Sequence, residues 1–464
     1  MAVVIGRDHT LAVTEDGKLW AWGRGIEGQL GLAHRQNMPT PTSVGSVVMS
    51  VVRFAMVAAG KWSSAALAED GTVWTWGYSP LKMSVDPTRR DKSAFGGSPA
   101  MMITCGELHT MVLAADGRLW TFGIGTNGQL GLGIAVGDKS APTLVLRFSH
   151  DLETKIVMVA AGAFHSMALT ANGDVYTWGS TKHGVLGHHN GDHENDPFRQ
   201  SKSVPFKIDR ACFAGSSVIM IAAGDRHSAA VTEEGKLFMW GSGAYGKLGL
   251  GDNETKEFPT SLSLNLFGKS PVRMVTCSDN HTMAVTEEGS LWSWGASFPI
   301  YYKNASFFPT RVDPRHFDGA KIVTAAAGLF ISIAVTEDGI LYSWGYSNDV
   351  MSPCLGHGDS DHHKPVPMRL SPHFMHNARI GRYHKIPALH AVAFAMGMHS
   401  RLGSGQPRRS KRIQGKPVDA NKPQGPSLVN QLDCCLVKMI LDASRSWPNL
   451  DALRTPGLLR LMGN

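Results

Sequence analysis

Apolar and polar positions alternate along the chain in one short pattern that returns seven times. The first copy, HTLAVTEDGKLWAWG (residues 9–23), has an apolar run, an acidic turn with glycine, and a second apolar run that ends in glycine. Asp-Gly and Asn-Gly turns supply the positive φ angles of tight hairpins, so each copy predicts a β-hairpin. Because strand side chains alternate between faces, Leu19 and Ala21 face one side of the sheet. Trp20 and Trp22 face the other side. Both faces are apolar, which predicts a sheet packed between two neighbouring sheets.

Two more strands flank each hairpin. An apolar strand that ends in Ala-Gly (AMVAAG, IVMVAAG, VIMIAAG) precedes most hairpins, and a loop with GQLG or a relative follows them. A proline-marked segment such as PTPTSV or FPTSL then indicates an edge strand, where proline is tolerated. Four strands repeated at roughly 50-residue spacing are typical of a β-propeller blade. The sequence therefore predicts an all-β fold, a seven-bladed β-propeller with a short, partly helical C-terminal tail.

The propeller is expected to occupy residues 1–400. Its repeats are clear over 1–370, and the strands that close the ring are expected within 366–400. VPMRL, residues 366–370, is placed to be the edge strand of the last blade. LHAVAFAMG, residues 389–397, resembles a further Ala-Gly strand, either a relic of an eighth unit or a strand packed at the seam.

The C-terminal part differs from the propeller in composition. Residues 371–464 contain 14 Lys and Arg against 4 Asp, a net charge of +10, and subtraction from the whole-chain +7 leaves −3 for residues 1–370. Glycine, proline and charge predict a flexible basic linker at 401–426. Leucines at helical spacing predict a short helical tail at 427–464. A compact basic cluster in the linker suits nuclear import or phosphate binding, and it consists of Arg408, Arg409, Lys411 and Arg412.

Composition excludes several classes of protein. The six cysteines show no zinc-like pairing and no disulfide framework, which fits a reducing compartment. No apolar run reaches the roughly 20 residues of a membrane span, and the N-terminus does not resemble a signal peptide. Histidine and aspartate gather in two turn-rich stretches without the spacing of a closed zinc site. We therefore expect a soluble monomer of the cytoplasm, the nucleus or both, with no metal, no cofactor and no membrane association.

The pattern AAG..HT.AL..DG.VW.WG....GQLG resembles the repeat of the regulator of chromosome condensation family, whose members form seven-bladed propellers. The resemblance covers about residues 1–370 and implies the fold more strongly than the function. The family includes exchange factors for the GTPase Ran, ciliary and ubiquitin-ligase scaffolds, and a plant ultraviolet-B receptor. That receptor repeats a Gly-Trp-Arg-His-Thr motif, but the matching places here are GKWSS, GAFHS, GDRHS and GELHT. Only Trp62 falls nearby, and it is out of register, so a photoreceptor is excluded.

A histidine opens the hairpin in five of the seven units. A position shared by symmetric units is expected to be structural, here a hydrogen-bonding anchor for the start of a strand. We accordingly predict no catalytic residues. The five histidines are His9, His109, His165, His227 and His281.

Partner contacts are expected where the units depart from the pattern. Units two and six lack GQLG after their hairpins, and residues 184–208 form the longest insertion between units. Ordinary loop drift is the alternative explanation for each departure. The candidate partner-binding residues are Lys82, Asp86, Arg89, Arg90, His188, His189, Asp192, His193, Tyr301 and Tyr302.

The sequence favours a non-enzymatic propeller that binds a protein partner, as a scaffold or regulatory module. The alternative is a guanine-nucleotide exchange factor for a Ran-like small GTPase, associated with chromatin or nucleic acid through the basic tail. The resemblance implies that such a factor presents a β-wedge and acidic loop residues to the GTPase. No segment matches that wedge residue by residue, and residues 184–208 are the place where one is expected.

Overall fold

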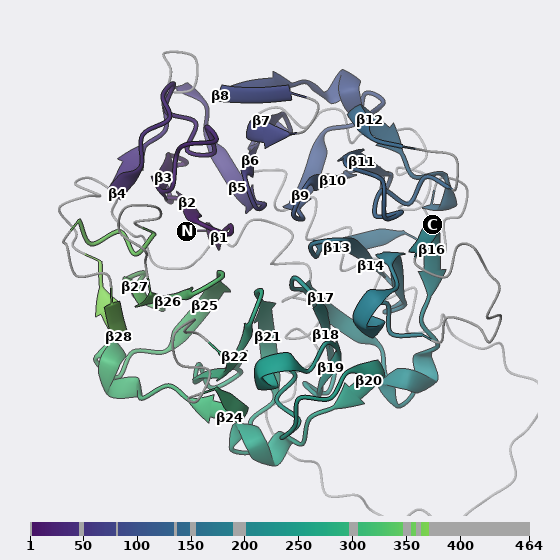
Figure 1. Cartoon of the computed structure of the whole chain (residues 1–464), viewed down its shortest axis with the longest axis vertical. Coiled ribbons are helices and arrows are strands. Elements are labelled where there is room, and N and C mark those ends of the chain that lie inside the picture. Colours follow the sequence, from purple (N-terminus) through teal and green to yellow (C-terminus); the bar gives the residue numbers. More distant parts are fainter. Residues whose placement is uncertain are drawn as a thin grey trace, which may run out of the picture. The chain divides into compact units, whose positions relative to one another are not determined.

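Seven four-stranded antiparallel sheets form a closed ring in the computed structural model of the chain, and each sheet is one blade of a β-propeller (Figure 1). The predicted all-β, seven-bladed fold is confirmed, with one blade for each repeated hairpin. The chain divides into two units, Met1–Ser400 and Arg401–Asn464. The structure describes residues 2–45, 51–79, 82–133, 137–148, 155–188, 201–296, 305–346, 354–358 and 363–370.

The strands of each blade follow the chain order from the axis to the rim. The first blade consists of β1 (Ala2–Ile5), β2 (His9–Val13), β3 (Leu19–Gly23) and β4 (Met38–Ser43). The second and third blades consist of β5 (Phe54–Ala59), β6 (Ser63–Ala68), β7 (Val73–Ser79), β8 (Lys82–Arg90), β9 (Ala100–Cys105), β10 (His109–Ala114), β11 (Leu119–Gly123) and β12 (Lys139–Leu144). The fourth and fifth consist of β13 (Ile156–Ala161), β14 (His165–Thr170), β15 (Val175–Ser180), β16 (Ser201–Lys207), β17 (Val218–Ala223), β18 (His227–Thr232), β19 (Leu237–Gly241) and β20 (Lys256–Ser261). The last two consist of β21 (Val272–Cys277), β22 (His281–Thr286), β23 (Leu291–Gly295), β24 (Ser306–Arg311), β25 (Ile322–Ala327), β26 (Ile331–Thr336), β27 (Leu341–Tyr346) and β28 (His363–Arg369).

The repeated hairpin has the register that the alternating pattern predicts. In the first blade His9 pairs with Gly23 across β2 and β3. Gly17 in the turn has φ +79° and Gly23 has φ +104°. A Cβ at Gly23 would lie 2.7 Å from the carbonyl oxygen of Asp8, so this glycine allows a close backbone approach. The positive φ predicted for the turn glycine is confirmed.

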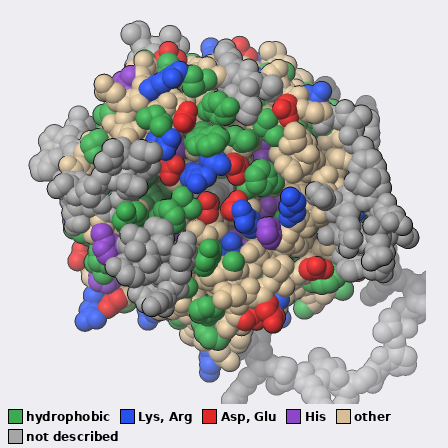
Figure 2. Space-filling model, viewed as in Figure 1, with side chains coloured by type: hydrophobic (Ala, Val, Ile, Leu, Met, Phe, Trp, Pro, Cys, Tyr) green, Lys and Arg blue, Asp and Glu red, His purple; other side chains and the backbone are tan. Residues whose placement is uncertain are grey.

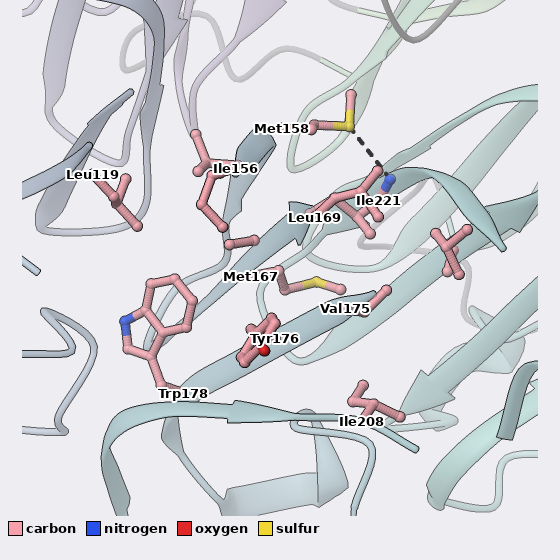
Figure 3. Packing of buried hydrophobic residues seen from close by; sticks show 14 of the residues in the cluster. Leu119, Ile156, Met158, Met167, Leu169, Val175, Tyr176, Trp178, Ile208 and Ile221 are labelled. Carbon is pink, nitrogen blue, oxygen red and sulfur yellow. Dashed lines mark hydrogen bonds between the residues drawn. The ribbon is translucent and has the colours of Figure 1, made fainter. Parts of the chain in front are cut away.

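Each blade buries both faces against its neighbours, as the apolar faces predict. Leu19 and Ala21 pack in a cluster with residues of the second blade, while Trp22 packs on the other side with residues of the seventh. Figure 3 shows the corresponding packing around the fourth blade, where Met158 and Trp178 lie among apolar side chains from adjoining blades. The core is therefore a series of layers between blades, and it continues around the ring.

Short 3-10 helices place one phenylalanine in most of these layers. They connect the outer strand of one blade to the inner strand of the next, and each ends in a buried phenylalanine. Phe213, for example, meets the rings of Phe238 and Trp240 edge-on at centroid distances of 5.6 and 6.1 Å. The five helices are η2 (Lys92–Phe95), η3 (Leu146–Phe148), η6 (Arg210–Phe213), η8 (Leu264–Phe267) and η10 (Pro314–Phe317).

The ring closes between two complete blades without exchange of a strand. β1 begins the first blade and β28 completes the seventh, and β28 (His363–Arg369) contains residues 366–369 of the predicted edge strand. Apolar packing joins Ala12 and Trp22 of the first blade to Ile333 of the seventh. Residues 389–397, together with the predicted linker and helical tail, lie outside the described residues, and their assignments stay predictions.

A buried group of four hydrogen-bonding residues joins neighbouring blades, and we call it the blade staple. Between the third and fourth blades, the backbone carbonyl of Gln129 accepts hydrogen bonds from Trp178 Nε1 and Ser166 Oγ, both at 2.8 Å. His109 Nε2 lies 2.9 Å from the same Ser166 hydroxyl. Because the hydroxyl proton is donated to Gln129, His109 must donate from Nε2, which fixes its neutral tautomer. The histidine is therefore a structural anchor, as predicted.

The same staple recurs at three other junctions. The carbonyl belongs to the GQLG loop of one blade, while the indole and the hydroxyl belong to the next blade. The Gln29 carbonyl accepts from Trp76 and Ser64, and His9 binds the Ser64 hydroxyl. The Val185 carbonyl accepts from Trp240 and Ser228, and His165 binds the Ser228 hydroxyl. The Lys247 carbonyl accepts from Trp294 and Thr282, and His227 binds the Thr282 hydroxyl.

The junction between the second and third blades has lost the loop, the histidine and the tryptophan of the staple and keeps the hydroxyl residue. The GQLG loop is absent, Ser63 takes the place of the histidine, and Phe122 takes the place of the tryptophan. Thr110, at the hydroxyl position, instead lies 3.6 Å from Cys105 Sγ. An indole N–H or an imidazole buried without its partner would cost free energy, so the loss of one partner favours replacement of the others.

We predict that the staple hydroxyl contributes about 1–3 kcal/mol to stability. Ser166→Ala removes the acceptor of the His109 N–H and one donor to Gln129 without a large change in volume. The thermal unfolding midpoint of this variant should fall by several degrees. Thr110→Val, at the junction without a staple, is the matched control and should shift the midpoint much less. Equal shifts for the two variants would contradict the role of the staple.

We also predict that the propeller loses stability in mild acid. Burial lowers the pKa of His9 and His165 to about 3 and of His109 and His281 to about 4, and that of His227 well below its usual value. In the unfolded chain histidine takes up its proton near pH 6.5, so stability is fully present above that pH and falls as the pH drops towards 4. For each buried histidine, the free energy of unfolding falls by up to about 1.4 kcal/mol per pH unit. Denaturation measured between pH 7.5 and 5 tests this, and a flat profile would contradict it.

Candidate functional site

One face of the ring carries the loops after the hairpins, which the sequence predicted to vary, together with the turns between the first and second strands. In an antiparallel blade, the turn from the first to the second strand and the loop from the third to the fourth strand leave the sheet at the same end. We call the seven turns between first and second strands the axial turns, because the inner strands border the axis (Figure 1). They comprise residues 6–8, 60–62, 106–108, 162–164, 224–226, 278–280 and 328–330.

Backbone hydrogen bonds join the axial turns of neighbouring blades. The N–H of Arg7 donates to Gly60 at 3.3 Å, that of Lys61 to Glu107 at 3.3 Å, and that of Asp225 to Ser278 at 3.1 Å. These bonds link axial turns at three of the seven junctions, so the turns of the first, second and fifth blades are each held by a backbone contact to the next blade.

Charged and aromatic side chains occupy this mouth. Lys61 forms an ion pair with Glu107 of the next blade and lies 4.4 Å from the ring centroid of Trp62. Trp62 in turn meets Tyr78 edge-on at 5.6 Å. Across the ring, Arg226 Nε lies 3.1 Å from Asp225 Oδ2. In the view of Figure 2, acidic and basic side chains gather around the centre of the ring beside hydrophobic ones.

Lys247 is the most unusual residue of this region. It replaces the glutamine of GQLG, whose side chain in the first blade stays within its own loop, where Gln29 Oε1 accepts from Glu27 N at 2.9 Å. The Lys247 side chain instead crosses to the next blade, and Nζ donates to the carbonyl of Asp279 at 3.0 Å. The residue is 2% exposed, and burial lowers the pKa of its amine to about 8.

Asp279 lies half-buried beside this amine. Burial, with the nearby charge of Asp225, raises the pKa of its carboxyl to about 6, while Arg7 and Lys247 oppose the rise. Among the residues that the structure describes, its carboxylate has no hydrogen bond and no ion pair. A buried cation and an unpaired carboxylate thus adjoin at the mouth of the axis. We call the seven charged residues of this mouth the axial site: Arg7, Lys61, Glu107, Asp225, Arg226, Lys247 and Asp279.

Four of the predicted partner-binding residues lie on a strand, where the sequence suggested a loop. β7 continues past Gly77, and Ser79 pairs with Lys82, so the second blade replaces the usual loop with a short connection into β8. Asp86 and Arg89 are exposed on this outer strand. Arg90 is half-buried, with its guanidinium 4.8 Å from the ring centroid of Phe122. The strand lies at the rim, away from the axial site, and its partner-binding role stays a prediction.

His188 is also at the rim. Its ring lies 4.6 Å from that of Phe206, beside a surface cavity of about 450 Å³ that Phe258 and Arg210 also line. No group of three or more metal-ligating side chains occurs among the described residues. The remaining candidates lie outside the described residues: His189, Asp192, His193, Tyr301, Tyr302, Arg408, Arg409, Lys411 and Arg412.

The axial site was not among the sequence predictions. One signal lay in GKWSS, GELHT and GDRHS, because the tips of these axial turns carry charge in several blades. The substitution of glutamine by Lys247 was a second signal. Neither signal says that residues from the first, second, third, fifth and sixth units lie at one mouth, because only closure of the ring brings them together.

The fold and this face can be compared with known proteins. The ultraviolet-B receptor UVR8 of Arabidopsis thaliana is 30% identical over 293 residues, which are 63% of this chain and 52% of the receptor. The human E3 ubiquitin-protein ligase HERC2 is 29% identical over 296 residues, 63% of this chain and 5% of the ligase. The mitochondrial RCC1 domain-containing protein RUG3 of Arabidopsis thaliana is 32% identical over 304 residues, 61% of this chain and 62% of RUG3. The chain thus spans less than two thirds of the length of each of these relatives.

Solved structures show the same fold. Human WBSCR16 superimposes with a TM-score of 0.64 at 22% identity, over 76% of this chain and 94% of that one. Prp20p of Saccharomyces cerevisiae also gives a TM-score of 0.64, at 21% identity, over 80% of this chain and 87% of that one.

No helix in the described part of the chain has the length and apolar character needed to cross a membrane.

Family models cover most of the propeller. The model of the regulator of chromosome condensation (RCC1) repeat matches residues 2–29 and 16–67, and that of the RCC1-like domain matches residues 82–387. With seven such blades closed into one ring, the chain belongs to the regulator of chromosome condensation family of β-propellers.

Proposed function

We propose that this propeller is a non-enzymatic interaction module that binds a protein partner through the axial site. The observation that carries the proposal is the arrangement of Lys247 and Asp279, a buried amine beside a carboxylate that has no hydrogen-bonding or ionic partner among the described residues. Keeping an amine out of water costs free energy, so the burial of Lys247 needs a compensating role. The exposed Arg7 and Arg226 and the half-exposed Trp62 add charged and aromatic contact area.

No group in the axial site is arranged for covalent catalysis. The nearby thiol of Cys277 is buried, and burial raises its pKa to about 12, which disfavours the nucleophilic thiolate. His227 donates from Nε2 to the staple hydroxyl of Thr282, and His281 Nε2 lies 2.9 Å from Ser332 Oγ, so both imidazoles are committed to structural contacts. These features support binding in preference to chemistry.

A guanine-nucleotide exchange factor for a Ran-like GTPase is the second candidate. The observation that favours it is the convergence of Glu107, Asp225 and Asp279 on one face, because exchange factors of this family are expected to offer acidic loop residues to the GTPase. Prp20p, which shares the fold, has been studied for binding to Gsp1p and histones. The predicted wedge within residues 184–208 falls largely outside the described residues, and chromatin binding through the basic tail stays a prediction.

We predict that partner capture depends on axial charges and not on charges of the opposite face. The test variant is Arg7→Glu with Arg226→Glu, and the matched control is Lys236→Glu with Lys321→Glu, two exposed lysines at the other end of the blades. Proteins cross-linked to the full chain in cell extract should be lost with the first pair and kept with the second. Loss with both pairs, or with neither, would contradict an axial interface.

The two candidate functions differ in a direct assay. Our proposal predicts that the purified chain leaves the release of fluorescent GDP from Ran-like GTPases at its intrinsic rate. Acceleration of about tenfold or more that Asp225→Asn or Asp279→Asn removes would establish the exchange factor instead. The control is the Lys236→Glu variant, which should behave as the unaltered chain in either case.

A further inference from the structure

The outer strands of the last four blades expose large apolar side chains to solvent. Pairing with the third strand aligns one proline in every outer strand, and in these four blades the residue before it is apolar and exposed. The same position in the first three blades holds Thr40, Asp86 and Ala141, which are polar or small. We call the exposed apolar residues of the four strands the apolar arc, and they are 40–53% exposed. The arc consists of Val204 and Phe206 of β16, Phe258 of β20, Phe308 of β24, and Val366 and Met368 of β28.

Two of these phenylalanines open onto one groove between neighbouring blades. Phe206 of the fourth blade and Phe258 of the fifth line a surface cavity of about 450 Å³, together with Arg210. That volume lies within the roughly 300–1,000 Å³ of typical ligand pockets, so the cavity has room for a large apolar side chain. At the next groove, a Cβ at Gly251 would lie 2.5 Å from Phe308 Cζ, so glycine leaves the space that this ring needs. Rings that are already seated against a neighbouring blade lose little freedom when a partner binds.

The backbone of these outer strands is poorly suited to pair with a further strand. The aligned proline of each strand has no N–H to offer. The loop of the preceding blade also uses backbone carbonyls of the outer strand. Gly133 N–H donates to Ser203 at 2.9 Å, and Gly251 N–H donates to Phe307 at 3.0 Å. A partner at this rim is therefore recognised through its side chains and not by extension of the sheet.

The same four outer strands carry an excess of positive charge. They contain six Lys and Arg residues and one acidic residue, Glu257, although residues 1–370 as a whole have a net charge of −3. Two of the six cations form ion pairs with neighbouring carboxylates, and one is buried. The remaining three have no ionic partner among the described residues: Lys202, Arg311 and Arg369. Negative charge on a partner complements this rim.

The placement of the arc favours an extended protein segment over other anionic partners. β16, β20, β24 and β28 follow one another along the outer edge of the ring, each turned from the last by one seventh of a circle (Figure 1). A flat membrane can therefore contact only part of the arc. Single-stranded nucleic acid stacks its bases on aromatic rings, but half of the arc has no ring, namely Val204, Val366 and Met368. A second copy of the chain would bring like charges together wherever two arcs met.

We propose that the apolar arc is a second interaction surface of the propeller. It binds an extended acidic segment of a protein partner and holds one large apolar side chain of that segment in the cavity between Phe206 and Phe258. The carboxylates of the segment lie near the cations of the outer strands. This surface lies at the rim, and its binding does not depend on the axial site.

Anisotropy of a short fluorescent peptide, titrated with the full chain, measures this binding. The peptide has three phenylalanines spaced among glutamates, and it should bind with a Kd below about 1 mM. A matched peptide with serine in place of phenylalanine should bind at least about tenfold more weakly, because it has no side chain for the cavity. The serine peptide also reports any attraction of glutamates to the basic linker, so the difference between the two peptides belongs to the arc. A third peptide, with lysine in place of glutamate, should bind more weakly than the first.

Variants of exposed residues test the two parts of the surface without loss of core packing. Phe206→Ser with Phe258→Ser should weaken binding of the phenylalanine peptide at least about tenfold, to the level of the serine peptide. The matched control is Leu146→Ser on η3 of the third blade, where an apolar side chain is 67% exposed outside the arc, and binding should not change. Unchanged thermal unfolding midpoints verify that both variants are folded.

The charges of the arc have their own pair of variants. Arg311→Glu with Arg369→Glu should weaken the phenylalanine peptide severalfold, because two cations without ionic partners become anions. Arg147→Glu, an exposed arginine beside Leu146, is the matched control and should leave the Kd unchanged.

Several results would overturn the proposal. These are equal binding of the phenylalanine and serine peptides, preference for the lysine peptide, or unchanged binding by the Phe206→Ser, Phe258→Ser variant. Tighter binding of oligouridine or of phosphatidylserine vesicles, lost in that variant, would assign the arc to nucleic acid or to a membrane instead. Self-association of the chain that the same variant removes would assign it to a second copy. Loss of peptide binding in the Arg7→Glu, Arg226→Glu variant would place the peptide at the axial site. Because the axial test uses different residues, failure of the arc leaves the proposed function standing.

Discussion

A backbone carbonyl shared between two blades is the interaction on which the rest of the ring depends. In the complete staple, a loop carbonyl of one blade accepts from a tryptophan and from a hydroxyl of the next blade, and a neutral histidine of the first blade binds that hydroxyl. Every one of these groups is buried, so each must find a partner within the protein. The staple therefore adds stability at the four junctions where it is complete, and it ties the loop of one blade to the second and third strands of the next.

The junctions without a complete staple show how the ring tolerates variation. Between the seventh and first blades Cys354 supplies the carbonyl for Trp22, while Ile331 replaces the histidine and packs against Ile5 and Leu355. Between the second and third blades the loop, the histidine and the tryptophan are all replaced together. Apolar contact then maintains the junction, and the second blade is free to end in a short hairpin beside Trp62 and Tyr78.

The axial site uses the same architecture for a different purpose. Lys247 belongs to the staple through its backbone carbonyl, which holds Trp294 and Thr282. Its side chain reaches the mouth of the axis, where Nζ donates to the carbonyl of Asp279 in the next blade. One residue thus joins the scaffold to the candidate binding surface, which makes the geometry of that surface as rigid as the ring itself.

The sequence by itself determined the fold. Apolar alternation, glycine at the turns and the sevenfold repeat are local properties, and each specifies a hairpin without information from elsewhere in the chain. It also predicted the structural role of His109 and its equivalents, because a position repeated in symmetric units serves the unit. The conformation of β8 was not predicted, since its pairing with β7 replaces a loop that other blades keep. Only the tertiary structure decided the axial site: Arg7, Asp225, Lys247 and Asp279 come from three blades, and closure of the ring brings them to one axis. Burial and electrostatic coupling arise from that convergence, so no single repeat contains the signal.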